Sequence, residues 1–67
     1  MTTNQLRDAI KKWTVANGRG PTYNELLVAL ATMLNRQVDS ADADELLDTA
    51  ISAGVIGKDA NGRYVAL

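Results

Sequence analysis

The side chains of this chain that could do chemistry are mostly carboxylates, and they are crowded into one short segment. Five of the eight acidic residues lie between Asp39 and Asp48, and the stretch from Gln37 to Gly57 contains no lysine or arginine. On a helix, residues four positions apart such as Asp44 and Asp48 share a face, and paired carboxylates can act as acid and base. An exposed helix offers no burial to favour the protonated form, so neither carboxylate has a reason to act as an acid at neutral pH.

The other residue types exclude most catalytic chemistry. The chain has no histidine and no cysteine, so it lacks the commonest bases, thiolate nucleophiles and zinc ligands. Gly18-Arg19-Gly20 is too short for a phosphate-binding loop, and no serine stands in a nucleophile-elbow context. We therefore expect no enzyme activity, no cofactor and no metal site.

Length and composition indicate a single small domain spanning residues 1–67. A chain of 67 residues with 46% apolar content buries roughly 60% of the surface that its unfolded form exposes. The longest apolar run, Leu26 to Ala31, is far shorter than the ~20 residues that span a bilayer. Met1 to Leu6 has no basic region before an apolar one. We expect a cytoplasmic protein without membrane contact, and the lack of cysteine fits a reducing compartment.

The first predicted helix covers residues 3–17. Thr2-Thr3-Asn4-Gln5 matches a capping box, in which the Thr2 hydroxyl and the Gln5 amide satisfy free backbone N–H groups. Gly18 is expected to end the helix, because glycine readily adopts the left-handed conformation of a C-cap. Helical spacing places four apolar residues, Trp13 among them, on the face toward the core: Leu6, Ala9, Ile10 and Trp13.

The second predicted helix covers residues 22–35. Gly20-Pro21 forms a turn, Thr22 and Glu25 form a second capping box, and Pro21 can pack on Leu26 as a hydrophobic staple. The main apolar face comprises Leu26, Leu27, Leu30, Met33 and Leu34. Val28 and Ala31 lie on the far side, so the helix is apolar nearly all round. Such a helix is either wrapped on both sides or paired with a partner.

The third predicted helix covers residues 40–53, starting at Asp39 or Ser40 and closed by Gly54. Its inward face comprises Ala43, Leu46, Leu47, Ala50 and Ile51. The residues left facing solvent or a partner are Asp42, Asp44, Glu45, Asp48, Thr49 and Ser52. A hairpin is predicted over residues 55–67, with the Asn-Gly turn signal between Asp59 and Gly62. The predicted fold class is mainly α with a small β-hairpin, a three-helix winged-helix-like domain.

Two segments that together cover about half of the chain resemble known families. The segment LLDTAISAGVIGKDANGRYVAL is similar to the third helix and wing of MarR-type winged helix-turn-helix domains, and GPTYNEL resembles the start of the second helix in LexA-type DNA-binding domains. The resemblance implies that Ser40 to Ser52 corresponds to the recognition helix and Lys58 to Arg63 to the wing. The sequence departs from the pattern in a connection about two residues longer than a compact helix-turn-helix.

Charge is the second departure from that family. A recognition helix reads base edges with basic or amide side chains, and DNA affinity comes largely from neutralising phosphates. The stretch from Gln37 to Gly57 has a net charge of −5, whereas the remainder has seven bases and three acids, a net charge of +4. Acids near a helix N-terminus also stabilise it by roughly 0.3–1 kcal/mol each, so capping and solubility alone explain the run. In either case the helix N-terminus is closed to phosphate.

Two functional hypotheses follow. The first is a small non-enzymatic regulatory module that binds another protein, one with a basic groove, through its third helix and the far side of its second helix: Asp42, Asp44, Glu45, Asp48, Val28 and Ala31. The alternative is a DNA-binding transcriptional regulator, dimeric through Val28 and Ala31, that uses the wing and first helix: Arg7, Lys11, Lys12, Lys58 and Arg63. The isoelectric point near 5.0 runs against the basic signature of nucleic-acid binders. The small size is compatible with a structural subunit or an accessory factor of a phage.

Overall fold

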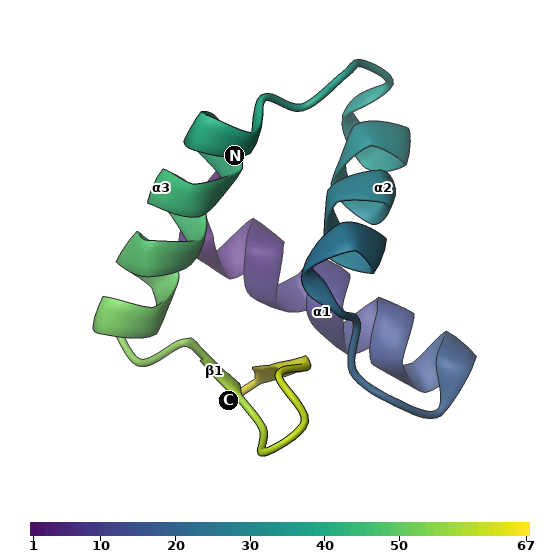
Figure 1. Ribbon diagram of the computed structural model, residues 1–67, viewed down its shortest axis with the longest axis vertical. Helices are drawn as coiled ribbons and strands as arrows, with labels where there is room; N and C mark the ends of the chain where they lie inside the picture. The colour runs from purple at the N-terminus through teal and green to yellow at the C-terminus, as the bar shows by residue number, and fades with distance from the viewer.

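The computed structural model describes all residues from 1 to 67 and contains three helices followed by a two-stranded hairpin. The elements are α1 (Thr3–Asn17), α2 (Tyr23–Leu34), α3 (Ser40–Ser52), β1 (Ile56–Lys58) and β2 (Tyr64–Ala66). In Figure 1, α2 and α3 stand on opposite sides, α1 crosses behind both, and the hairpin closes the lower end. The predicted fold class is confirmed, and the arrangement is consistent with a winged helix.

Both predicted capping boxes are present. The Gln5 backbone N–H donates to Thr2 Oγ1 at 3.1 Å, and the Thr2 backbone N–H donates to Gln5 Oε1 at 2.9 Å. Thr22 and Glu25 make the same reciprocal pair at the start of α2. Gly18 ends α1 in the left-handed region with φ 72°, as predicted. These local signals fix where the first two helices begin and how the first one ends.

Gly62 is the residue of the hairpin turn that adopts a left-handed backbone conformation. Strands β1 and β2 are antiparallel, with Ile56 opposite Ala66 and Lys58 opposite Tyr64. The Gly62 N–H donates to the Asp59 carbonyl at 3.1 Å, and Gly62 alone in the turn has a positive φ, of 76°. The Asp59 carboxylate accepts from the backbone N–H groups of Asn61 and Arg63 at 2.9 Å each. The predicted tight turn is confirmed, with a left-handed glycine after an Asp-anchored turn.

The connection between α1 and α2 lies along β2. The Tyr64 N–H donates to the Pro21 carbonyl at 2.8 Å, and the Arg63 guanidinium donates to the Gly20 carbonyl at 3.3 Å. A methyl group added to Gly20 would overlap the Tyr64 carbonyl oxygen. Gly20 and Pro21 are both buried. This close approach attaches the hairpin to the start of α2 and therefore sets where the wing stands.

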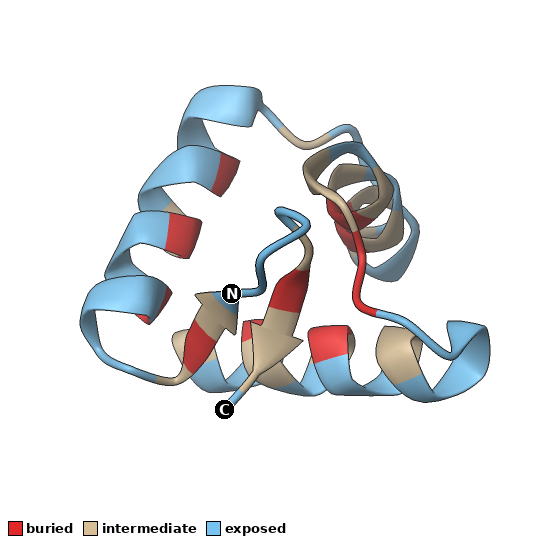
Figure 2. Ribbon diagram, turned by 60° about the horizontal axis from the view of Figure 1, so that its bottom comes forward, coloured by how far each residue is buried: buried red, intermediate tan, exposed pale blue.

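The core is built from one stripe on each helix and one residue of each strand. Its fully buried members are Leu6, Ile10, Leu26, Leu30, Ala43, Leu47, Ala50, Ile56 and Tyr64. Figure 2 shows this buried surface on the inward side of every element. This core is small, so some apolar residues remain exposed on the surface of the domain.

Two predicted core residues, Met33 and Ile51, are exposed, and five others are only half-buried: Ala9, Trp13, Leu27, Leu34 and Leu46. Trp13 is half-buried at a hollow that residues of α1 and α2 line together. Met33 is 51% exposed and Ile51 is 41% exposed. The residues of α2 that are buried in the core are Leu26 and Leu30. Those of α3 are Ala43, Leu47 and Ala50. Met33 and Ile51 lie beside these stripes, where a domain of this size has no further layer to cover them.

Candidate protein-binding surface on the third helix

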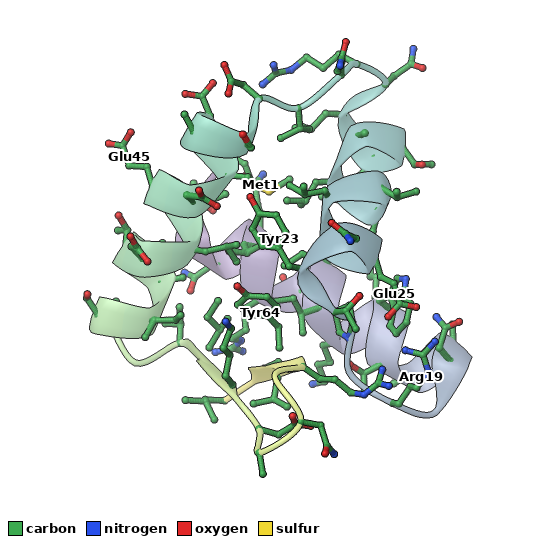
Figure 3. The ribbon with its side chains drawn as sticks, in the orientation of Figure 1. Met1, Arg19, Tyr23, Glu25, Glu45 and Tyr64 are labelled. Atoms are coloured by element: carbon green, nitrogen blue, oxygen red, sulfur yellow. The ribbon has the colours of Figure 1, made fainter.

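One side of α3 is buried and the opposite side is acidic. Ala43, Leu47 and Ala50 are buried at i, i+4 and i+7, so the helix turns the other side outward. That outward side carries Asp42, Glu45 and Asp48, which we call the acidic face. All three are exposed, and none has a hydrogen bond or an ion pair through its carboxylate. In Figure 3, Glu45 points away from the rest of the molecule.

Asp44 has a different role from the other three predicted acids. The Tyr23 hydroxyl donates to Asp44 Oδ1 at 2.6 Å, which joins the first residue of α2 to α3. This hydrogen bond, with burial as the second cause, raises the pKa of Tyr23 to about 12. Figure 3 shows the Tyr23 ring between the two helices. Asp44 therefore helps to position the acidic face.

The start of α3 is capped by its own acids. Asp39 is the N-cap residue, and its Oδ1 accepts from the Ala41 backbone N–H at 2.9 Å. Asp42 lies in the first turn, where a negative charge interacts favourably with the helix dipole. A phosphate group would approach a helix end at which the Ala41 N–H already donates to a carboxylate and Asp42 adds negative charge. Capping and the helix dipole thus account for Asp39 and Asp42 and leave Glu45 and Asp48, further along the helix, without a structural role.

Two of the seven basic side chains, those of Arg19 and Arg63, lie close to the Glu25 carboxylate. The Arg19 guanidinium donates to Glu25 Oε1 and Oε2 at 2.8 Å each, and Arg63 Nη1 lies 3.8 Å from Oε1. The Arg19 guanidinium and the Thr22 backbone N–H hold the pKa of Glu25 down at about 2. Arg63 also donates to the Gly20 carbonyl. Arg63, predicted as a wing contact for DNA, therefore ties the wing to the start of α2. Figure 3 shows Arg19 and Glu25 near this junction.

The remaining predicted DNA contacts have no acidic partner. Lys58 is exposed on β1, and its ammonium group lies 5.0 Å from the centroid of the Tyr64 ring. Lys11 and Lys12 are exposed on α1, and Arg7 on the same helix is half-buried. None of these three α1 bases forms an ion pair. The structure thus leaves four of the five bases available and places none of them on α3.

A shallow apolar hollow lies between α1 and α2. Its volume is about 670 Å³, and its lining comprises Trp13, Asn24, Glu25, Val28, Ala29, Thr32 and Met33. Val28 is 67% exposed at this hollow, as its place on the far side of α2 predicts. Ala31 is half-buried and does not line it. Helical periodicity assigns Trp13 and Met33 to the core, so the sequence pattern does not reveal them at this surface.

Two features that many functional proteins have, a metal site and a membrane-spanning helix, are not found here. No group of three or more acidic side chains comes together in a way that could hold a metal ion. None of the three helices combines the length and the hydropathy that crossing a bilayer requires.

No protein-family model matches the chain, and neither the curated proteins nor the solved structures include a significant match to it. The class of the protein is therefore defined by its fold alone. It is a three-helix domain with a C-terminal antiparallel hairpin in a winged-helix-like arrangement.

Proposed function

We propose that this chain is a small non-enzymatic regulatory module that acts mainly by contact with another protein through the acidic face. The observation that carries the proposal is the state of Asp42, Glu45 and Asp48. They are exposed and unpaired, on a helix where no base offsets their charge. The resemblance to MarR-type domains makes this helix the one that would otherwise read DNA. The same position here suits a different partner.

The sign of the charge argues against DNA as the partner of α3. Binding to a duplex depends on neutralising phosphates with lysine and arginine, and each carboxylate near the backbone opposes that term. Asp39 already caps the helix N-terminus, which is the usual docking point for phosphate. A recognition helix with this surface would repel the duplex from its first turn to Asp48.

A protein partner with a basic groove fits the same surface. Exposed carboxylates accept paired hydrogen bonds from arginine, and complementary charge accelerates association. Ile51, 41% exposed at the edge of α3, adds an apolar contact beside the charges. Thr49 and Ser52 are also exposed on this helix and supply uncharged polar contacts. The surface thus combines the charged rim and the apolar element that protein interfaces commonly contain.

The alternative of a DNA-binding regulator is supported by one observation. Lys58, Lys11 and Lys12 are exposed and Arg7 is half-buried, and none of the four has an acidic partner. These bases could contact phosphates through the wing and α1. That mode would give weak affinity with a steep dependence on salt, because it would rest on charge neutralisation.

Quantitative affinity capture from cells that express the chain tests the proposal. The variant Asp42→Lys/Glu45→Lys reverses charge on the acidic face and leaves the Tyr23–Asp44 hydrogen bond intact. Val15→Lys, at a residue of α1 that is 80% exposed and away from the acidic face, is the control. We expect a specific protein partner to be captured by wild type and by the control and to be lost from the double variant. A partner list that is the same for all three proteins would overturn the role of the acidic face.

A further inference from the structure

The outer side of α2 differs from every other helix surface of this chain in having almost no charge. Only one residue of α2 is charged, Glu25, which forms an ion pair with Arg19 at 2.8 Å and lies 3.8 Å from Arg63. Val28, Thr32 and Met33 are exposed along the helix, and Trp13 of α1 lies beside them at the hollow. We call these four residues the α2 face. An exposed apolar patch of this kind marks an interaction site.

The charges on the three helices indicate which surface could bind a second copy of the chain. A two-fold interface sets a surface against its own copy, so it must be complementary to itself. If two copies met through α3, the carboxylates of one copy would face those of the other and repel them. The outer side of α1, which carries three bases and one acid, would oppose like charges as well. The α2 face is bordered at one end by Glu25 with Arg19 and Arg63, and at the other by Asp8 with Lys12 and Met1, which border the adjoining hollow at Met33. Each end therefore carries both signs of charge, whereas α3 carries only acids, and the face is compatible with a second copy of itself.

The shape of the α2 face also favours a second copy of the chain as its partner. Val28 projects from α2 with 67% of its surface exposed, directly beside a hollow lined by Trp13 and Met33. When two copies of α2 cross near Val28, the projecting side chain of one copy meets the hollow of the other, and the contact is made twice. This is the packing of ridges into grooves that helices commonly adopt.

We propose that this chain forms a two-fold homodimer through the α2 face, with Val28 of each copy seated between Trp13 and Met33 of the other. A stable dimer removes roughly 800 Å² from each partner. The whole chain exposes 4256 Å², so roughly 800 Å² is about a fifth of its surface, and the interface must extend beyond the four residues of the α2 face to the surface around them. The proposal goes beyond the proposed function and does not depend on it. Because α3 stands on the opposite side from α2 (Figure 1), the dimer leaves both acidic faces free.

Sedimentation velocity with a matched pair of variants tests the dimer. Val28→Glu places a charge in the centre of the α2 face. Val15→Glu makes the same change at a valine that is 80% exposed on α1 and does not line the hollow. Over a series from ~1 µM to ~1 mM, a range that brackets interfaces of this size, wild type and Val15→Glu should pass from monomer to dimer. Val28→Glu should stay monomeric, with circular dichroism confirming that it is folded. If Val28→Glu does not fold, Thr32→Glu at the same face takes its place.

Trp13 gives a second readout, because it is the only tryptophan and lies at the proposed interface. Its emission should shift to longer wavelength as wild type is diluted and should not change with concentration in Val28→Glu. The dimer should persist at ~1 M salt, where exposed ion pairs are screened. A wild type that stays monomeric up to the highest concentration would overturn the proposal and would leave the hollow to another partner or to none. Equal dissociation by Val15→Glu, or loss of the dimer in salt, would overturn it too.

Discussion

The Tyr23 hydroxyl donates a 2.6 Å hydrogen bond to the Asp44 carboxylate, and this contact joins the first turn of α2 to the side of α3. The two residues are 21 positions apart, so no local sequence pattern predicts this hydrogen bond. The contact shows that one of the five acids near α3 helps to place the helix, while Asp42, Glu45 and Asp48 remain available outside. The distinction decides which acids a functional test should change.

Removing the charge at position 44 should release Tyr23. In Asp44→Asn the pKa of the Tyr23 hydroxyl should fall from about 12 toward its ordinary value of 10.0, because the main cause of the shift is the Asp44 carboxylate. A ¹³C NMR titration of the Tyr23 ring carbon that bears the hydroxyl measures this directly. A pKa that is equal in wild type and Asp44→Asn would show that the hydrogen bond does not form in solution.

The same shift predicts a loss of stability in alkali. The folded-state pKa of Tyr23 lies above the unfolded value, so its contribution is complete below pH 10 and disappears as the pH rises toward 12. The urea midpoint of wild type should therefore fall across this window more steeply than that of Tyr23→Phe. Parallel curves for the two proteins would contradict the assignment.

Glu25 predicts the opposite behaviour in acid. The Arg19 guanidinium lowers the folded-state pKa of Glu25 from 4.5 to about 2, so its contribution is complete above pH 4.5 and is lost as the pH falls toward 2. Wild type should exceed Glu25→Gln in urea midpoint at neutral pH, and the difference should shrink between pH 4.5 and 2. A difference that is constant with pH would mean that the carboxylate charge plays no part.

A glycine pair tests how the wing is attached. Gly20→Ala should destabilise the fold by about 1–3 kcal/mol, because the added methyl group meets the Tyr64 carbonyl and forces the α1–α2 connection away from β2. At Gly57 an added methyl group would lie 3.5 Å or more from its nearest neighbours, so Gly57→Ala should be tolerated far better. Urea unfolding of the two variants measures the contrast. Equal stability of both would show that the connection is not held against the strand.

Charge reversal should change the response of α3 to DNA. Wild type should show little binding to a duplex at low salt, whereas Asp42→Lys/Glu45→Lys/Asp48→Lys should bind measurably, with an affinity that falls steeply as salt rises. Fluorescence anisotropy of a labelled random duplex follows both proteins. Tight binding by wild type, weakened by Lys58→Ala, would instead favour the wing and α1 as a DNA surface.

The fold was largely predictable from the sequence because its signals are local. Thr2 and Thr22 begin helices by capping, Gly18 ends one, and Asp59 to Gly62 specifies the turn. Each signal acts within a few residues along the chain, so reading it requires no knowledge of tertiary packing.

The surfaces were less predictable because they depend on packing between elements. Helical periodicity places Trp13 on the same stripe as Ile10, but only the crossing of α1 and α2 reveals that Trp13 lies at an open hollow. The role of Arg63 in holding the wing likewise depends on the approach of Gly20 to β2. Local patterns do not contain the angle between helices, which decides both features.

The central claim is that the acidic face of α3 meets protein, and site-specific photo-crosslinking in cells tests it most directly. A photoreactive phenylalanine analogue at Ser52, exposed on α3, reports what touches that helix, and the same analogue at Val15 is the control. We expect a discrete adduct from position 52 that protease degrades and nuclease leaves intact, with no such adduct from position 15. A nuclease-sensitive adduct at position 52 would contradict the account, because it would place the acidic helix against nucleic acid.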